Sequence, residues 1–189
     1  MQTIFVIAGP TNAGKDTVMR QLLPQTELNL AKVITSTSRP PRPGEIDGID
    51  YHFYTKEEFQ KKIDNNEFFE WSIVHNDFKG IQKSSIYNDI SKNKNILIQL
   101  DIQGFQKIKQ NIDTSKYKII GIFILPPTME ELKRRMKIRN TEHDPKDIEK
   151  RINDAIYEIE HKDVFDYTVI NDNLEKCIEE IKTIIKNNS

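Results

Sequence analysis

Short apolar runs alternate along this chain with longer segments in which apolar residues recur at helical spacing. The runs at residues 3–8, 95–100, 119–125 and 167–170 are mostly apolar on both faces, as in strands buried inside a parallel sheet. Shorter strand candidates lie at 32–35, 51–54 and 68–74, and helical periodicity covers 15–23, 56–65, 128–138, 145–161 and 174–186. This alternation predicts an α/β fold, with a parallel sheet core flanked by helices.

Composition narrows the class of protein. The 189 residues correspond to one domain, or to one core domain with small inserted lobes. Lys and Arg total 28 against 29 for Asp and Glu, which argues against a bulk nucleic-acid binder or a polybasic membrane binder. The single cysteine, Cys177, has no internal disulfide partner, and the four histidines are too dispersed to suggest a metal site. With no signal-peptide pattern and no run near the roughly 20 apolar residues that span a bilayer, we expect a cytoplasmic protein; its oligomeric state stays open.

A glycine-bearing turn separates the first strand from its helix. The turn, here called the 9–17 turn, consists of Gly9, Pro10, Thr11, Asn12, Ala13, Gly14, Lys15, Asp16 and Thr17. Glycines let backbone N–H groups point at an anion, the helix N-terminus adds its dipole, and a lysine reaches the β- and γ-phosphates. The turn therefore predicts a phosphate-binding loop (P-loop) for ATP.

Asp16 departs from the usual phosphate-binding pattern, which has a Ser or Thr after the lysine. A hydroxyl there binds Mg²⁺, and a carboxylate can do the same because Mg²⁺ prefers hard oxygen ligands. The alternative is an acidic residue in the first turn of a helix, favoured by the helix dipole and without a metal role. The sequence leaves both readings open.

A second anion site is indicated by a Pro- and Gly-rich loop after the second strand candidate. Arg39 and Arg42 stand three apart beside Pro40, Pro41 and Pro43. Two fork-shaped guanidinium groups held in this way can clamp a phosphate. Taken alone, arginines in such a loop are as well explained by solvation.

The order of motifs resembles that of the guanylate kinases. The 9–17 turn is followed by STSRPPRPGEIDGIDYHF, EFFEW, LDIQG and FILPP, and the likeness runs collinearly from Ile4 to about Ile185. The resemblance implies a nucleoside monophosphate kinase with a core at 1–34, 92–138 and 148–189, an acceptor-binding lobe at 35–91 and a mobile lid at 139–147. It implies ATP-dependent phosphorylation of GMP or dGMP, with Mg²⁺, giving ADP and GDP or dGDP.

The same resemblance implies roles for acceptor-binding residues. Arg39, Arg42 and Tyr51 would bind the acceptor phosphate, and Thr35 would approach the guanine carbonyl. Glu70 would accept from guanine N1–H and the exocyclic amine, a double donor that adenine lacks, although an exposed strand carboxylate is the alternative reading. Asp101 would lie near the acceptor nucleoside.

Donor-side roles also follow from the resemblance. Arg135, Arg139 and Arg151 match arginines that stabilise the transferring phosphoryl group, although Arg135 and Arg151 are also compatible with solvent-facing helix positions. Asn171 and Asp172 match a family turn near the ATP base, although Asn-Asp at a strand end is also common in ordinary turns. Lys15 and Mg²⁺ would neutralise the β- and γ-phosphate oxygens.

The sequence departs from the family pattern at the acceptor site and at the metal. A Tyr-Tyr-Gly-Ser/Thr stretch in the family is Phe78-Lys79-Gly80-Ile81 here. Lys79 can still serve the acceptor phosphate as a point charge. Ile81 cannot hydrogen-bond a base, so Gln82 and Ser84 are the candidates to compensate, and the sequence leaves guanine selectivity open. Gln99 replaces an acidic residue at a strand end, and Asp16 is a candidate to substitute for it.

Two other functions remain possible at this point. The Gly14-Lys15-Asp16 turn also resembles that of ribose 1,5-bisphosphate kinases, which phosphorylate a sugar phosphate. Some scaffolding proteins carry a non-catalytic guanylate-kinase-like module that binds phosphopeptides. The arginine loop and Glu70 favour a nucleotide acceptor over the sugar phosphate, and Lys15 favours an enzyme over the binding module.

Overall fold

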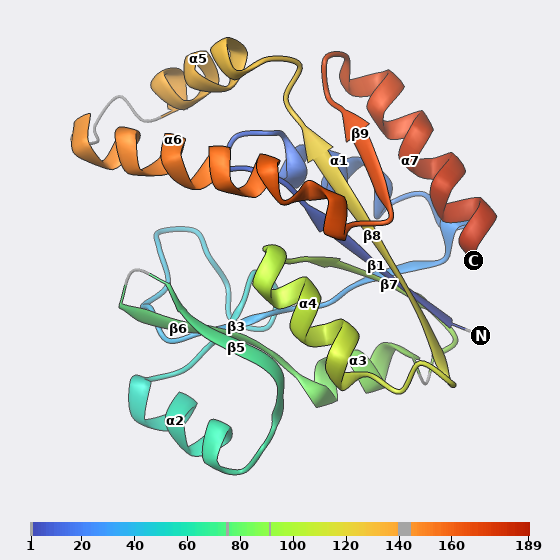
Figure 1. Ribbon diagram of the computed structural model, residues 1–189. Helices are drawn as coiled ribbons and strands as arrows, with labels where there is room; N and C mark the ends of the chain where they lie inside the picture. Colours follow the sequence, from blue (N-terminus) through green and yellow to red (C-terminus); the bar gives the residue numbers. More distant parts are fainter. Residues whose placement is uncertain (1, 75, 91, 140–144) are drawn as a thin grey trace.

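A five-stranded parallel sheet lies at the centre of the computed structural model, which describes residues 2–74, 76–90, 92–139 and 145–189 (Figure 1). The side chains of 74, 89, 90, 139 and 145–147 lie outside that description. The strand order is β2-β7-β1-β8-β9. The strands are β1 (Gln2–Ala8), β2 (Leu30–Lys32), β7 (Asn95–Gln99), β8 (Tyr117–Leu125) and β9 (Tyr167–Ile170). This parallel α/β core confirms the fold class predicted from the sequence.

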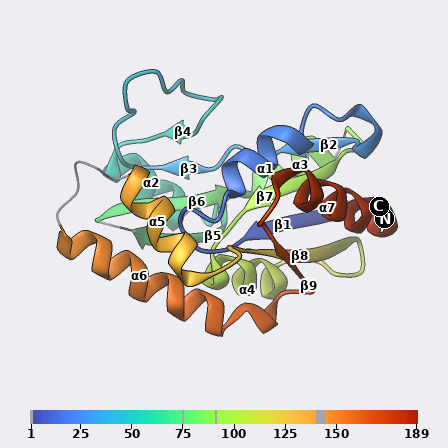
Figure 2. The ribbon, with the colours of Figure 1, turned by 90° about the horizontal axis from the view of Figure 1, so that it is seen from above.

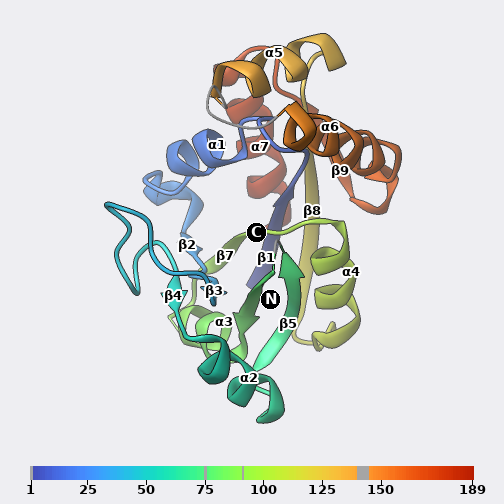
Figure 3. The ribbon, with the colours of Figure 1, turned by 90° about the vertical axis from the view of Figure 1, so that its left-hand side faces the viewer.

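Helices cover both faces of this sheet. Figures 2 and 3 show α1 (Lys15–Leu22) and α7 (Leu174–Asn188) on one side of β1, and α4 (Ile102–Asn111) on the other. Successive residues of β1 point to opposite faces, so Phe5 packs with α1 and α7 while Ile4 packs with α4. Cys177 is buried in the cluster beneath α7.

Two further helices and two short 3₁₀ helices complete the core. They are α5 (Met129–Arg139), α6 (Pro145–Glu160), η1 (Thr26–Leu28) and η2 (Lys162–Val164). Leu132, Met136 and Ala155 form a small buried cluster between α5 and α6. No helix in the described part of the chain is long and apolar enough to cross a membrane.

A second, mixed sheet is inserted between β2 and β7. Its order is β4-β3-β6-β5, formed by β3 (Ser36–Thr37), β4 (His52–Phe53), β5 (Phe68–Val74) and β6 (Asp77–Gln82). Helix α2 (Lys56–Asp64) starts with a capping box of Thr55 and Glu58, and α3 (Lys83–Ile90) leads back to β7. Phe59 of α2 is fully buried and stacks on Phe68, with ring centroids 4.4 Å apart, so α2 is fixed to the sheet.

The predicted strand at 32–35 is wrong in its bounds. The chain leaves the parallel sheet after Lys32 and enters the second sheet at Ser36, so of the predicted run only Lys32 belongs to a strand and residues 33–35 connect β2 to β3. Helices α3 and α4 and strand β6 were not predicted. Gly104 in the first turn of α4 and Gly80 inside β6 weaken the periodic pattern of both segments.

Parallel strands bring several loops to one edge. The 9–17 turn follows β1, Asp101 follows β7, and Asn171 follows β9 directly. In open α/β sheets, ligands bind outside the carboxyl ends of the strands. The fold therefore gathers these segments where a ligand site is expected.

Candidate active site

Two glycines allow the 9–17 turn to lie against the neighbouring strands. Gly9 has φ +138° and Gly14 has φ +99°, values that other residues rarely adopt. A Cβ on Gly9 would lie 2.3 Å from the carbonyl oxygen of Ile124, and one on Gly14 would lie 2.3 Å from Nδ2 of Asn171. Neither position has room for a side chain.

The turn presents positive charge and backbone donors on its inner side. Lys15 Nζ donates to the carbonyl oxygens of Gly9 at 2.6 Å and Pro10 at 2.8 Å. Helix α1 has Gly14 as its N-cap and no side-chain cap hydrogen bond there. Its first N–H groups and its dipole therefore favour an anion at this end.

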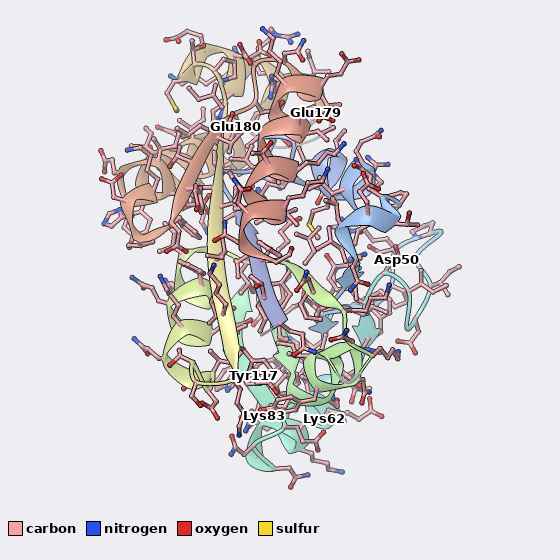
Figure 4. The ribbon with its side chains drawn as sticks, turned by 90° about the vertical axis from the view of Figure 1, so that its right-hand side faces the viewer. Asp50, Lys62, Lys83, Tyr117, Glu179 and Glu180 are labelled. Carbon is pink, nitrogen blue, oxygen red and sulfur yellow. The ribbon has the colours of Figure 1, made fainter. Side chains whose placement is uncertain are left out.

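A cavity of about 580 Å³ extends from this turn to the second sheet. Asp50, on the loop between β3 and β4, also lines it and is labelled in Figure 4. The cavity joins segments far apart in the sequence. Of the site residues that the sequence predicted, those on its wall are Gly9, Thr11, Lys15, Asp16, Thr35, Tyr51, Glu70, Lys79 and Asp101.

Glu70 is a buried carboxyl group on the cavity wall. Its residue is 8% exposed, and no described residue donates a hydrogen bond to its carboxylate. Burial first, and the nearby Asp101 second, raise the pKa of Glu70 to about 7, while Lys107 acts in the opposite direction. A ligand that donates to this carboxylate would relieve its desolvation, so the site is suited to a base with adjacent N–H groups.

Asp101 has a structural task in addition to its place on the wall. Its Oδ1 accepts a hydrogen bond of 2.7 Å from the Gly104 amide, so Asp101 is the N-cap of α4. The bond fixes the carboxylate at the cavity.

The arginine loop is held by an ion pair. Arg39 donates from both terminal nitrogens to Glu45 at 2.6 Å, and its guanidinium lies 5.1 Å from the centroid of the Tyr51 ring. Arg39 holds the pKa of Glu45 at about 2. Arg39 and Arg42 are absent from the cavity lining, although both lower the pKa of Lys79, after burial as the largest cause. Positive charge is thus concentrated around Lys79.

Arg135 is not brought to this cavity. It lies beside a second hollow of about 370 Å³ on the other side of the 9–17 turn, where Thr17 and Asp172 also lie. Its Nε donates to Glu131 at 2.8 Å, and its Nη2 donates to the carbonyl oxygen of Asn171 at 3.2 Å. The Asn171 side chain is buried and donates to the Ala13 carbonyl at 2.8 Å, which ties the turn to the end of β9.

Five other predicted positions lie away from the first cavity or outside the described side chains. Arg151, on α6, is half-buried and lines neither hollow. Pro10 and Ala13 are buried within the turn, while Asn12 lines the second hollow. The Arg139 side chain and residues 140–144 of the expected lid lie outside the described residues.

Glu158 of α6 is a cavity residue that sequence reasoning missed. Burial, followed among the raising causes by Asp101 and Asp154, raises its pKa to about 7, and Lys15 opposes that rise. It stands seven residues after Arg151, two helical turns along the same face. Because Arg151 was a predicted site residue, this spacing was the sequence signal that could have pointed to Glu158.

The two candidates to compensate for Ile81, Gln82 and Ser84, do not line the cavity. Ile81 is fully buried in the core, and Gln82 Oε1 accepts from Tyr54 at 3.0 Å and Ser36 at 3.2 Å. Thr35, the other hydroxyl predicted to approach the guanine carbonyl, does line the cavity.

Comparison with known proteins agrees with this architecture. A family model for guanylate kinase matches residues 1–188. The guanylate kinase of Clostridium perfringens (strain 13 / Type A) is 38% identical over 96% of this chain and 82% of its own length. That of Dechloromonas aromatica (strain RCB) is 39% identical over 97% of this chain and 88% of its own.

A solved structure gives the same result. The crystal structure of guanylate kinase from Anaplasma phagocytophilum superposes with a TM-score of 0.77 at 29% identity, covering 99% of this chain and 86% of that one. Fold and site together define a nucleotide-binding kinase, a transferase of the α/β class. The chain belongs to the guanylate kinase family. These relatives do not favour the two alternatives, a ribose 1,5-bisphosphate kinase and a non-catalytic binding module.

The raised pKa of Glu70 predicts a pH dependence of stability. Between about pH 4.5 and 7 the folded chain keeps a proton that the unfolded chain releases, so this group's contribution to the free energy of unfolding falls as pH rises. Glu70→Gln removes that contribution. Urea unfolding of the ligand-free protein from pH 5 to 8 should therefore show the variant gaining stability relative to wild type as pH rises.

Glu67→Gln is the matched control for this experiment. Lys62 lowers the pKa of Glu67, so the group is ionised in both states above pH 5 and its contribution is constant there. Parallel pH curves for wild type and Glu70→Gln would contradict the prediction.

Proposed function

We propose that this chain transfers the γ-phosphoryl group of ATP to GMP or dGMP, giving ADP and GDP or dGDP. One observation carries the proposal: a single cavity has Lys15 of the 9–17 turn on one part of its wall and the buried carboxyl of Glu70 on another. The first suits a polyphosphate and the second a base with two adjacent donors.

The donor end is assigned to the 9–17 turn as a P-loop. Its backbone N–H groups and Lys15 would hold the β- and γ-phosphates of ATP. The second hollow opens from Gly14 and Thr17 of this turn towards Asn171 and Asp172, so it is suited to the rest of the ATP molecule. Arg135 would contact the donor from there, and Arg139 and Arg151 are proposed to complete the charge around the transferring group.

The acceptor end is assigned to the second sheet and its arginine loop. Glu70 would accept from guanine N1–H and the exocyclic amine, with Thr35 and Asp101 beside it on the wall. Tyr51, Lys79, Arg39 and Arg42 would hold the acceptor phosphate, and Lys79 already lies in the field of both arginines. Phosphate binding requires Arg39 to exchange or share its donors with Glu45.

Little covalent chemistry is asked of the protein in such a transfer. The acceptor phosphate is anionic at neutral pH and attacks without a general base, so alignment and charge neutralisation dominate.

The division into core (1–34, 92–138 and 148–189), acceptor lobe (35–91) and lid (139–147) remains our proposal, supported by the separation of the two sheets. We also propose a cytoplasmic location that involves no nucleic acid or membrane partner.

The cavity is compatible with a magnesium ion bound mainly by nucleotide. Among the described residues, no group of three or more His, Cys, Asp or Glu could hold a metal ion. Mg²⁺ on nucleotides commonly uses one or two protein carboxylates plus phosphate oxygens and water. Asp16, exposed on the wall next to Lys15, fits that requirement, and Gln99 lines the same cavity. When bound, Mg²⁺ would supply neutralisation of the β- and γ-phosphate oxygens.

Loss of the lysine tests the proposed function directly. With GMP as acceptor, Lys15→Ala should lower ADP release by about 10²-fold to 10³-fold, because phosphoryl charge loses its nearest fixed cation. A coupled assay of ADP formation measures it. Lys83→Ala is the control, since Lys83 lies away from the cavity and donates to the carbonyl of Asn66 (Figure 4). Folded wild type that releases no ADP with GMP would overturn the proposal.

Removal of the Asp16 carboxylate tests the metal assignment. If Asp16 shares in holding Mg²⁺, Asp16→Ala, which leaves no oxygen ligand at this position, should require about 3-fold to 10-fold more Mg²⁺ for half-maximal turnover. Asp50→Ala is a matched control, because Asp50 lines the same cavity from a different loop. Superimposable Mg²⁺ titrations for wild type and Asp16→Ala would instead support the helix-dipole reading.

A further inference from the structure

A serine hydroxyl lies beside Glu70 on the cavity wall. Ser72 stands two residues after Glu70 on β5, and alternate residues of a strand point to the same face. Both line the cavity, whereas Trp71 between them packs edge-to-face against Phe78 with ring centroids 6.0 Å apart. The hydroxyl and the carboxyl therefore face the same ligand space.

Ser72 also lies next to the positive end of the acceptor site. In the antiparallel register of β5 and β6, Ser72 pairs with Lys79 and Glu70 pairs with Ile81. Lys79 lines the cavity, while Ile81 is fully buried in the core. Ser72 thus neighbours both the carboxyl assigned to the base, two residues away on β5, and the lysine assigned to the phosphate, opposite it on β6.

The hydroxyl is available for a ligand. In the part of the chain that the structure describes, no residue forms a hydrogen bond with the Ser72 side chain. Gln82 Oε1 already accepts hydrogen bonds from Tyr54 and Ser36, and Ser84 does not line the cavity. The described hydroxyl side chains on the wall are those of Thr11, Thr35, Tyr51 and Ser72, of which Thr11 belongs to the 9–17 turn and Tyr51 is assigned to the acceptor phosphate.

Guanine needs a donor that a carboxylate cannot supply. Its N1–H and exocyclic amine are donors, but O6 and N7 are acceptors. An ionised Glu70 only accepts, whereas a hydroxyl can donate. An acceptor left unpaired in a buried site costs binding free energy.

We propose that Ser72 is a further specificity-determining residue, whose hydroxyl donates to the O6–N7 edge of guanine while Glu70 accepts from N1–H and the amine. The inference rests on the proposed function, since it assumes GMP as the acceptor. A hydroxyl on β5 would then contact the base in this chain, where the family pattern has a Ser or Thr on β6 at the position of Ile81.

Ser72→Ala tests the inference. The variant should raise KM and Kd for GMP about 5-fold to 10-fold, the loss of one hydrogen bond, with kcat and the KM for ATP unchanged. Ser72→Thr keeps a hydroxyl and should restore most of the affinity. Thermal unfolding of both variants without ligand should match wild type, because the side chain makes no hydrogen bond within the described structure.

Base analogues separate hydrogen bonding from packing. Two analogues are used, the 5′-monophosphates of 2-aminopurine riboside, which lacks O6 and the N1–H, and of 7-deazaguanosine, which lacks N7. The ratio of the Kd values of Ser72→Ala and wild type is compared for each ligand, so that the loss of the N1–H affects both proteins alike, and this ratio should fall to about 1 for at least one analogue. An equal loss of affinity for GMP and both analogues, or no loss for GMP, would overturn the inference.

Calorimetric binding of GMP keeps the two proposals apart. Wild type that binds GMP but releases no ADP would overturn the proposed function, and the Kd values of Ser72→Ala and Ser72→Thr would still decide the inference. Wild type that neither binds nor phosphorylates GMP would overturn both.

Discussion

The close approach of the 9–17 turn to β8 and β9 is the constraint on which the site depends. Gly9 lies against the Ile124 carbonyl and Gly14 against the Asn171 amide, at distances that exclude a Cβ. Asn171 then donates to Ala13 and closes the contact from the strand side. Because the turn is pinned in this way, Lys15 and the first amides of α1 lie at one end of the cavity without needing a ligand to order them.

The buried carboxyl groups of the cavity, unlike the turn, depend on a ligand for the stability of their ionised form. Glu70 and Glu158 are both desolvated, and both have a pKa raised to about 7. Buried acids of this kind weaken the ligand-free fold at neutral pH, whereas a bound donor or cation stabilises their ionised form. Both carboxyl groups lie in one cavity with Lys15 and Asp101. Their desolvation lowers the stability of the ligand-free protein, and ligand binding offsets this loss.

Much of this arrangement was predictable from sequence, for identifiable reasons. Buried strands such as β1 and β8 are apolar on both faces, and the 9–17 turn carries its signal in consecutive residues. Other features depend on tertiary contacts. The chain crosses between sheets at 33–35, Arg135 lies at the second hollow rather than the first, and Glu158 enters the cavity from a distant helix. Ser72 was missed because the sequence alone does not show that Ile81 of β6 is buried in the core. It also does not show that Ser72 and Glu70 of β5 line the same cavity.

We propose that Glu70 selects guanine in the cavity, and the rate of ADP release with a panel of acceptors measures that selectivity. ADP release would be measured with ATP and Mg²⁺ against GMP, dGMP, AMP, UMP, CMP and ribose 1,5-bisphosphate at equal concentration. The account predicts turnover confined to GMP and dGMP. Comparable turnover with another base or with ribose 1,5-bisphosphate would contradict it, because neither presents the paired donors that a buried carboxylate requires.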